Sequence, residues 1–147
     1  MRGSIKVLIV DDEETLRNLL KSILEREGYN VACVDNVASA RLALKEKAFD
    51  VVVTDIKMPK ENGYKLLEFV KKQFPSVGVI LMTGFGDMYT VKDAMLLGAD
   101  EYITKPFKGF EIAVIVERVY WRMRAPKSQS VPTEPVPAEQ VGPIEDK

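Results

Sequence analysis

The chain has 147 residues, which suits one domain with a sizeable core and is too short for two full domains. With 21 Lys and Arg against 22 Asp and Glu, the formal net charge is −1, so nothing in the charge balance draws the chain to nucleic acid or to anionic lipid. The sequence has one cysteine and no histidine, which excludes Ser-His-Asp and Cys-His catalysis, histidine-ligated zinc, multi-cysteine metal sites and an internal disulfide.

Short apolar runs of the β type alternate with helical stripes of apolar residues over about the first 120 residues. The β-type runs predict strands at 5–10, 31–34, 51–54, 79–82 and 101–104. Apolar residues at helical spacing predict the helices that follow these strands: Leu16, Leu19, Leu20, Ile23 and Leu24; Ala40, Ala43, Leu44 and Ala48; Leu66, Leu67, Val70 and Phe74; Val91, Ala94 and Met95; and the segment 110–123. Asp35 and Asn36 are good N-cap residues for the second helix, whereas Gly28, Pro75 and Gly98 mark helix ends.

Five strands alternating with five helices predict an α/β fold with a parallel sheet covered on both faces. The right-handed crossover rule favours the flavodoxin-like doubly wound (βα)5 arrangement, with strand order 2-1-3-4-5. A closed eightfold barrel requires about 250 residues and is excluded by length.

The composition changes near residue 124. The segment 125–147 holds five of the eight prolines and no aromatic residue, so we expect a disordered tail or linker there. Residues 1–4 are expected to be a short extension, and residues 5–124 to form the domain. No apolar run approaches the ~20 residues of a membrane span, and the N-terminus lacks a signal-peptide stretch, so we expect a cytoplasmic protein without membrane contact.

Acidic residues follow two strands that this strand order makes neighbours. Asp11 and Asp12 come directly after the first strand, and Asp55 comes after the third. Ligands of such sheets bind at the carboxyl ends of the strands, where the strand order reverses. Thr83 and Lys105 end the fourth and fifth strands at the same edge. We therefore expect three carboxylates, a hydroxyl and an ammonium to meet in one site.

Such a cluster needs neutralisation, because two like charges about 4 Å apart repel by about 4 kcal/mol at an effective dielectric constant near 20. Oxygen ligands alone favour a hard cation, and Mg²⁺ suits one or two carboxylates. Asp55 beside Mg²⁺ could act as a nucleophile toward phosphorus, with Lys105 and Thr83 contacting the phosphoryl oxygens.

Each residue taken singly also has a purely structural interpretation. Asp11 and Asp12 could cap the first helix, Asp55 could lie in a surface turn, Thr83 could cap a strand and Lys105 could be a solvated charge. The conjunction of complementary groups at four strand ends favours the functional interpretation.

Four segments of the chain, spread over residues 5–124, resemble the receiver domain of two-component response regulators. They are Val10-Asp11-Asp12-Glu13, Thr54-Asp55-Ile56-Lys57-Met58-Pro59 with Gly63, Met82-Thr83-Gly84, and Ile103-Thr104-Lys105-Pro106-Phe107. Within that family, the segments 83–87 and 97–102 are most similar to receivers of enhancer-binding transcription activators.

The resemblance implies a role for each matching position. Asp55 would be the phosphoacceptor, Asp11 and Asp12 would hold Mg²⁺ together with the Lys57 backbone carbonyl, and the Lys105–Pro106 bond would be cis, as in many relatives. The remaining implied roles are phosphoryl binding and switching by Thr83, phosphoryl binding by Lys105, and an aromatic switch at Tyr102.

The resemblance further implies a switch rather than an enzyme. A separate sensor histidine kinase would phosphorylate Asp55, and the face made by the fourth helix, fifth strand and fifth helix would control an output partner or effector domain, or form a homodimer, without direct nucleic acid binding by this chain. Its last helical turn, 120–124, is either an interaction anchor or core packing with helix-end cations. Lys57 and Phe85 flank the site with side chains unsuited to orienting water, so self-dephosphorylation is expected to be slow.

Two alternatives are weaker. A nucleotide-binding or phosphohydrolase domain lacks its motifs, because position 89 is Tyr instead of the third glycine of G-x-G-x-x-G, no G-x-x-x-x-G-K-[ST] is present, and position 57 is Lys instead of an acid. An interaction module that works without phosphorylation would have no need of Asp12, Asp55, Thr83 and Lys105 together.

Overall fold

The computed structural model describes residues 4–84 and 91–125. Predictions that concern Phe85, the segment 85–90 and the tail 126–147 therefore lie outside the described residues. The elements in chain order are β1 (Lys6–Val10), α1 (Glu14–Arg26), β2 (Asn30–Val34), α2 (Val37–Glu46), β3 (Val51–Asp55), α3 (Gly63–Gln73), β4 (Gly78–Thr83), α4 (Val91–Leu96), β5 (Glu101–Thr104) and α5 (Gly109–Arg124).

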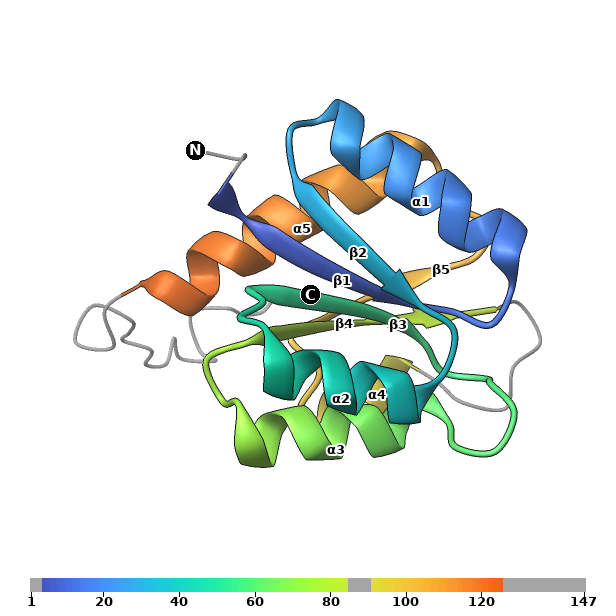
Figure 1. Cartoon of the computed structure of the whole chain (residues 1–147), viewed down its shortest axis with the longest axis vertical. Helices are drawn as coiled ribbons and strands as arrows, with labels where there is room; N and C mark the ends of the chain where they lie inside the picture. The colour runs from blue at the N-terminus through green and yellow to red at the C-terminus, as the bar shows by residue number, and fades with distance from the viewer. Residues whose placement is uncertain (1–3, 85–90, 126–147) are drawn as a thin grey trace, which may run out of the picture.

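The strands form one parallel sheet in the order β2-β1-β3-β4-β5, which confirms the predicted topology (Figure 1). Val10 pairs with Val34 on one side of β1 and with Thr54 on the other, so β1 lies between β2 and β3. The chain therefore reverses its direction of winding between β1 and β3, and the carboxyl ends of these two strands are adjacent.

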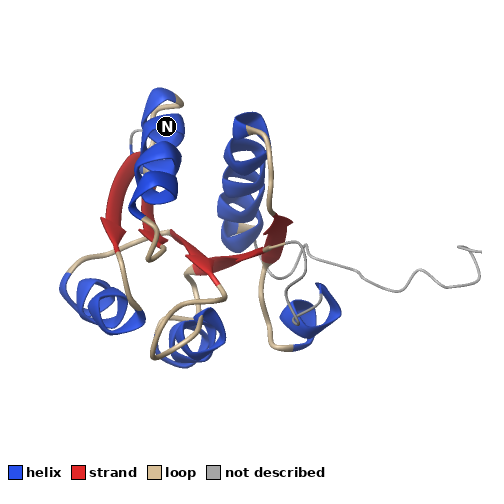
Figure 2. Cartoon of the chain, turned by 90° about the vertical axis from the view of Figure 1, so that its right-hand side faces the viewer, coloured by secondary structure: helices blue, strands red, loops and turns tan. Residues whose placement is uncertain are grey.

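Helices cover both faces of the sheet: α1 and α5 pack on one face and α2, α3 and α4 on the other (Figure 2). Side chains alternate between the two cores, so Val7 and Ile9 pack with α1 and α5 whereas Leu8 and Val10 pack with the other helices. Every residue of β3 and β4 is buried, which explains why these strands are continuous apolar runs rather than alternating ones.

One helix begins, and two helices end, at residues that the sequence indicates. Asn36 is the N-cap of α2, and its side-chain oxygen accepts a hydrogen bond of 2.7 Å from the Ser39 amide. Gly28 and Gly98 both have φ of 98°, the left-handed conformation that glycine adopts after a helix. Asp35 is not the cap, but it accepts a hydrogen bond from the Asn36 side chain.

Three apolar residues do not lie where the helical stripes predicted them. Leu19 is 52% exposed, because Leu20 and Leu24 are the α1 residues fully buried against the sheet and Leu19 points about 100° away from Leu20. α2 ends at Glu46, so Ala48 lies beyond it and is exposed. Met95 of α4 is 48% exposed, whereas Ala94 beside it is fully buried. Phe74, the C-cap residue of α3, packs against the core as predicted.

The last turn of α5 shows the core packing and the helix-end cations of one predicted interpretation, and the interaction anchor stays a prediction. Trp121 is exposed and makes a T-shaped ring contact with Tyr120, whereas Tyr120 and Met123 are partly buried against the core. Arg122 pairs with Glu101 at 3.0 Å, and the Arg124 guanidinium lies over the Tyr120 ring at 4.2 Å.

Candidate functional site

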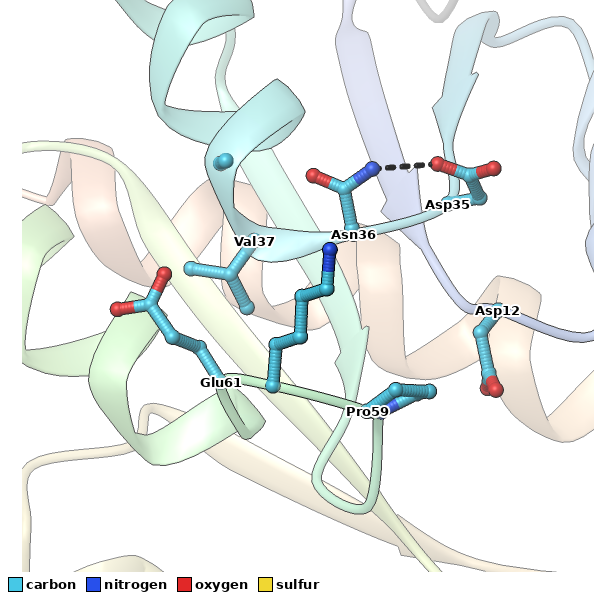
Figure 3. Close-up of a pocket in the computed structure, with 8 residues that line it drawn as sticks. Asp12, Asp35, Asn36, Val37, Pro59 and Glu61 are labelled. Atoms are coloured by element: carbon cyan, nitrogen blue, oxygen red, sulfur yellow. Dashed lines mark hydrogen bonds between the residues drawn. The ribbon is translucent and has the colours of Figure 1, made fainter.

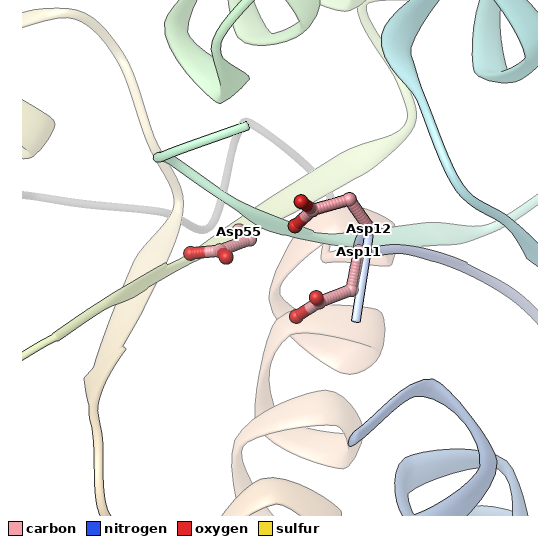
Figure 4. Close-up of side chains that lie close together, drawn as sticks. All are labelled: Asp11, Asp12 and Asp55. Carbon is pink, nitrogen blue, oxygen red and sulfur yellow. The ribbon is translucent and has the colours of Figure 1, made fainter. Parts of the chain in front are cut away.

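Three carboxylates meet at the carboxyl edge of the sheet (Figure 4). Asp11 and Asp12 directly follow β1, and Asp55 is the last residue of β3. Because β1 and β3 are parallel neighbours with Val10 opposite Thr54, their ends bring these side chains together. One oxygen from each of the three carboxylates lies within 4.8 Å of the others.

Lys105 reaches the same cluster from the loop after β5. Its ammonium nitrogen lies 3.2 Å from Asp55 Oδ2 and 3.8 Å from Asp11 Oδ2. The backbone amide of Lys105 donates a hydrogen bond of 2.7 Å to the Thr83 carbonyl, which fixes the loop to the end of β4. The Lys105–Pro106 peptide bond is cis.

The other sequence-predicted residues surround this cluster at different depths. Thr83 ends β4 and is 4% exposed, one residue beyond the pairing of Asp55 with Met82. Lys57 has an exposed side chain, but its backbone amide donates a hydrogen bond to the Asp55 carboxylate. Tyr102 lies in β5 opposite Leu81 and is half-buried.

Asp11 has the most constrained carboxyl group of the cluster. Its Oδ1 accepts a hydrogen bond of 2.8 Å from the Glu13 amide, whereas its buried Oδ2 accepts none from any residue that the structure describes. Burial, together with the charge of Asp55, raises the Asp11 pKa to about 6 against the opposing effect of the Glu13 amide. The N-cap of α1 is Glu13, so Asp11 holds the loop before the helix rather than capping it.

Burial also raises the pKa of Asp55, which is 7% exposed. The Lys105 ammonium and the Lys57 amide both favour the ionised carboxylate and limit this shift. Asp55 is therefore a poorly hydrated carboxylate whose charge is stabilised by donors on two sides, an arrangement suited to a nucleophile.

The donor set fits a hard divalent cation. The three carboxylates offer oxygen atoms only, and the Lys105 ammonium alone cannot neutralise all three. The Asp11 Oδ2 atom is buried without a hydrogen-bond donor, which is costly unless a proton or a cation contacts it. Mg²⁺ prefers such carboxylate oxygens and retains several waters, so the residues present fit this ion.

Three features of the site escaped the sequence analysis. The Arg17 guanidinium donates a hydrogen bond of 2.8 Å to the Asp11 carbonyl and fixes the loop after β1. Gly63 is packed so closely against β3 that an added Cβ would lie 2.3 Å from the Asp55 carbonyl oxygen. Arg41 forms two hydrogen bonds of 2.7 Å with Glu61. The glycine belonged to a quoted motif, whereas nothing in the local sequence marks the two arginine contacts.

A hollow beside the cluster runs from Asp12 to the N-terminus of α2 and the loop after β3 (Figure 3). Asp12, Asp35, Pro59 and Glu61 lie around it. The site therefore opens toward the β3–α3 loop. Among the described residues, no helix is long and apolar enough to cross a membrane.

Comparison with known proteins identifies regulators that are similar in sequence. An NtrX-like response regulator of Rickettsia bellii is 38% identical over 116 residues, which make up 78% of this chain and 24% of that protein. The DNA-binding transcriptional regulator NtrC of Proteus hauseri is 33% identical over 121 residues, which make up 82% of this chain and 26% of that protein. The chain thus spans about a quarter of the length of these curated relatives.

Solved structures agree in fold. A response regulator receiver domain protein from Clostridium thermocellum has a TM-score of 0.75 and 34% identity, covering 82% of this chain and 97% of that one. The beryllofluoride-activated NtrC4 receiver domain dimer has a TM-score of 0.75 and 34% identity, covering 80% and 98%. The model of the response regulator receiver domain family matches residues 7–117. This chain belongs to the response regulator receiver domain family, and its relatives are receivers of NtrX- and NtrC-like enhancer-binding activators.

Proposed function

We propose that this receiver accepts a phosphoryl group on Asp55 from a sensor histidine kinase, in a Mg²⁺-dependent reaction. The observation that carries the proposal is the position of the Asp55 carboxylate, which lies 3.2 Å from the Lys105 ammonium and within 4.8 Å of oxygens of Asp11 and Asp12. The 147 residues contain no histidine, so the phosphohistidine donor lies outside this stretch of sequence.

The transfer exchanges one bond to phosphorus for another. An Asp55 carboxylate oxygen attacks the phosphorus atom, and an O–P bond forms as the N–P bond of the phosphohistidine breaks. The departing imidazole nitrogen keeps the electron pair of that bond and takes up a proton from solvent. Asp55 suits this role because burial strips it of water while Lys105 and the Lys57 amide favour its ionised form.

Asp11, Asp12 and Asp55 would hold Mg²⁺ through their carboxylates, and Lys57 through its backbone carbonyl. When bound, Mg²⁺ supplies positive charge that offsets negative charge on the phosphoryl oxygens. Lys105 adds an ammonium 3.2 Å from Asp55 Oδ2, and the Thr83 hydroxyl would donate a hydrogen bond to a phosphoryl oxygen.

Phosphorylation would act as a switch rather than as a step of catalytic turnover. The new phosphoryl oxygens draw Thr83 toward Asp55, and Tyr102 turns inward to fill the space that Thr83 leaves. The face made by α4, β5 and α5 then carries the change to an output domain or partner, or to a second copy of the chain. This face exposes Met95, Leu96 and Trp121.

We further propose that residues 5–124 form the functional unit, that it acts in the cytoplasm, and that the chain makes no nucleic acid contact of its own. Self-dephosphorylation is expected to take minutes or longer, because the exposed Lys57 ammonium cannot orient an attacking water as a carboxylate or amide could.

Incubation of the full chain with acetyl phosphate and Mg²⁺ tests the proposal. Intact-protein mass spectrometry should show one added phosphoryl group that is stable in acid and labile in base. Asp55→Asn should abolish the addition, and so should a chelator. Addition of a phosphoryl group to Asp55→Asn, or none to the wild type, refutes the assignment.

A further inference from the structure

An ion pair on the outside of the β3–α3 loop holds this loop against α2. The Arg41 guanidinium, on α2, donates from both terminal nitrogens to the two carboxylate oxygens of Glu61, each at 2.7 Å. The same guanidinium lies over the ring of Phe69 on α3, 5.6 Å from its centroid. Arg41 therefore connects α2, the loop and α3, and its planar fork fixes both the distance and the orientation of Glu61.

The loop that Glu61 belongs to contains a strained turn. The Glu61 amide donates a hydrogen bond of 2.8 Å to the Pro59 carbonyl, and the residue between them, Lys60, has φ of 69°. A three-residue turn with positive φ at its centre is rare and unfavourable for a residue with a side chain. Such a conformation persists only where surrounding contacts hold it, and the Arg41–Glu61 pair lies directly beside it.

The loop leads from this turn to the candidate metal site within a few residues. Its ends are joined by a hydrogen bond of 2.8 Å from the Gly63 amide to the Ile56 carbonyl. Gly63 is pressed against the Asp55 carbonyl, so these ends cannot shift independently of β3. Between the joined ends, the partly buried Met58 packs against the core and Glu61 is held by Arg41. The position of the Lys57 backbone, next to Met58, therefore depends on these two attachments as well as on the hydrogen bond from its own amide to the Asp55 carboxylate.

We propose that Arg41 and Glu61 are positioning residues that hold the Lys57 backbone in place for metal binding and phosphoryl transfer at Asp55. This inference rests on the proposed function, because it assigns a determinant of metal affinity at the same site. Neither side chain touches the reacting atoms. Their effect is to keep a strained loop in one conformation, so that its backbone carbonyl is available to the ion without a cost of ordering the loop.

The test measures the Mg²⁺ dissociation constant of the full chain by titration calorimetry. Arg41→Gln and Glu61→Gln should each weaken Mg²⁺ binding by about tenfold, the lower end of what removal of an outer-shell partner costs. Arg41→Lys keeps the charge but not the fork and should fall between these variants and the wild type. The exchanged pair Arg41→Glu with Glu61→Arg should recover most of the affinity.

A second ion pair serves as the matched control. Lys21 and Glu25 on α1 lie 3.1 Å apart with 42% and 48% of their side chains exposed, against 29% and 38% for Arg41 and Glu61. Glu25→Gln should leave Mg²⁺ affinity unchanged. Hydrogen exchange should quicken in peptides that cover residues 56–63 in Arg41→Gln and not in Glu25→Gln.

The outcomes separate this inference from the proposed function. Wild-type Mg²⁺ affinity in Arg41→Gln and Glu61→Gln, even with a lower melting temperature, would mean that the pair only packs α2 against the loop, and would overturn the inference alone. A wild-type chain that binds no Mg²⁺ and takes up no phosphoryl group would overturn both.

Discussion

Replacement of Asp11 by asparagine should stabilise the metal-free protein. The Asp11 carboxyl is fully buried, and burial with the neighbouring charge of Asp55 raises its pKa from 3.8 to about 6. A raised pKa means that the folded state favours the neutral carboxyl. The stability that the neutral Asp11 carboxyl gives the folded protein, relative to the ionised one, is complete below about pH 4. It is lost as the pH rises through the folded-state pKa of about 6. Asparagine keeps the neutral form at every pH.

The size of the effect follows from the shift. Each pKa unit corresponds to about 1.4 kcal/mol, so a shift from 3.8 to about 6 costs the folded protein about 3 kcal/mol once Asp11 is ionised. Asp11→Asn removes this cost at about pH 8, where the melting temperature of a domain of this size should rise by roughly 10 °C. The asparagine carbonyl oxygen can still accept the hydrogen bond of the Glu13 amide.

Thermal unfolding with a chelator and with saturating Mg²⁺ provides the assay. The wild type should gain stability from Mg²⁺. Asp11→Asn should have the higher melting temperature in chelator and gain little from Mg²⁺, because it lacks one of the proposed metal ligands. Asp35→Asn, which removes an exposed carboxylate at the end of β2, should change stability by less than about 0.5 kcal/mol. An Asp11→Asn protein that is no more stable than the wild type in chelator at high pH would refute the electrostatic reasoning.

Three further predictions concern the same edge of the sheet. The stability gained from Mg²⁺ by the wild type should grow as the pH rises through about 6, since protons then leave Asp11; a gain that does not change with pH in unfolding curves would contradict this. Gly63→Ala should lower the free energy of unfolding by about 1–3 kcal/mol and slow phosphorylation, because its Cβ would lie 2.3 Å from the Asp55 carbonyl; wild-type melting and labelling would exclude that crowding. Lys57→Glu should shorten the phosphoprotein half-life by placing a carboxylate where it can orient water, and an unchanged rate of phosphate release would count against this.

Much of the fold could be predicted because its signals are local. Asn36 caps α2, and Gly28 and Gly98 follow helices with positive φ, since each position is decided by its own backbone geometry. The strand order followed from the alternation of strands and helices and the handedness of their connections. The prediction that Leu19 is buried was wrong, because apolar spacing marks a helical face but does not show how much of that face the sheet covers.

For the site, residue type and position at the strand ends indicated which groups would converge. Asp11, Asp12, Asp55 and Lys105 lie together because parallel strands deliver their carboxyl ends to one edge. The sequence could not show which of these groups is buried and which is exposed, or which lacks a hydrogen-bond donor. Only packing determines that one Asp11 oxygen is buried without a hydrogen-bond donor while Asp12 is exposed.

The amino-acid sequence by itself determined the family, the order of the elements and the acidic edge, because these depend on residue type, periodicity and chain connectivity. Only the tertiary structure decided that Arg41 forms an ion pair with Glu61 and that Gly63 packs closely against the Asp55 carbonyl. These contacts depend on how α2 and the β3–α3 loop are set against the end of the sheet. That placement is a property of the packed core as a whole and has no local signature in the chain.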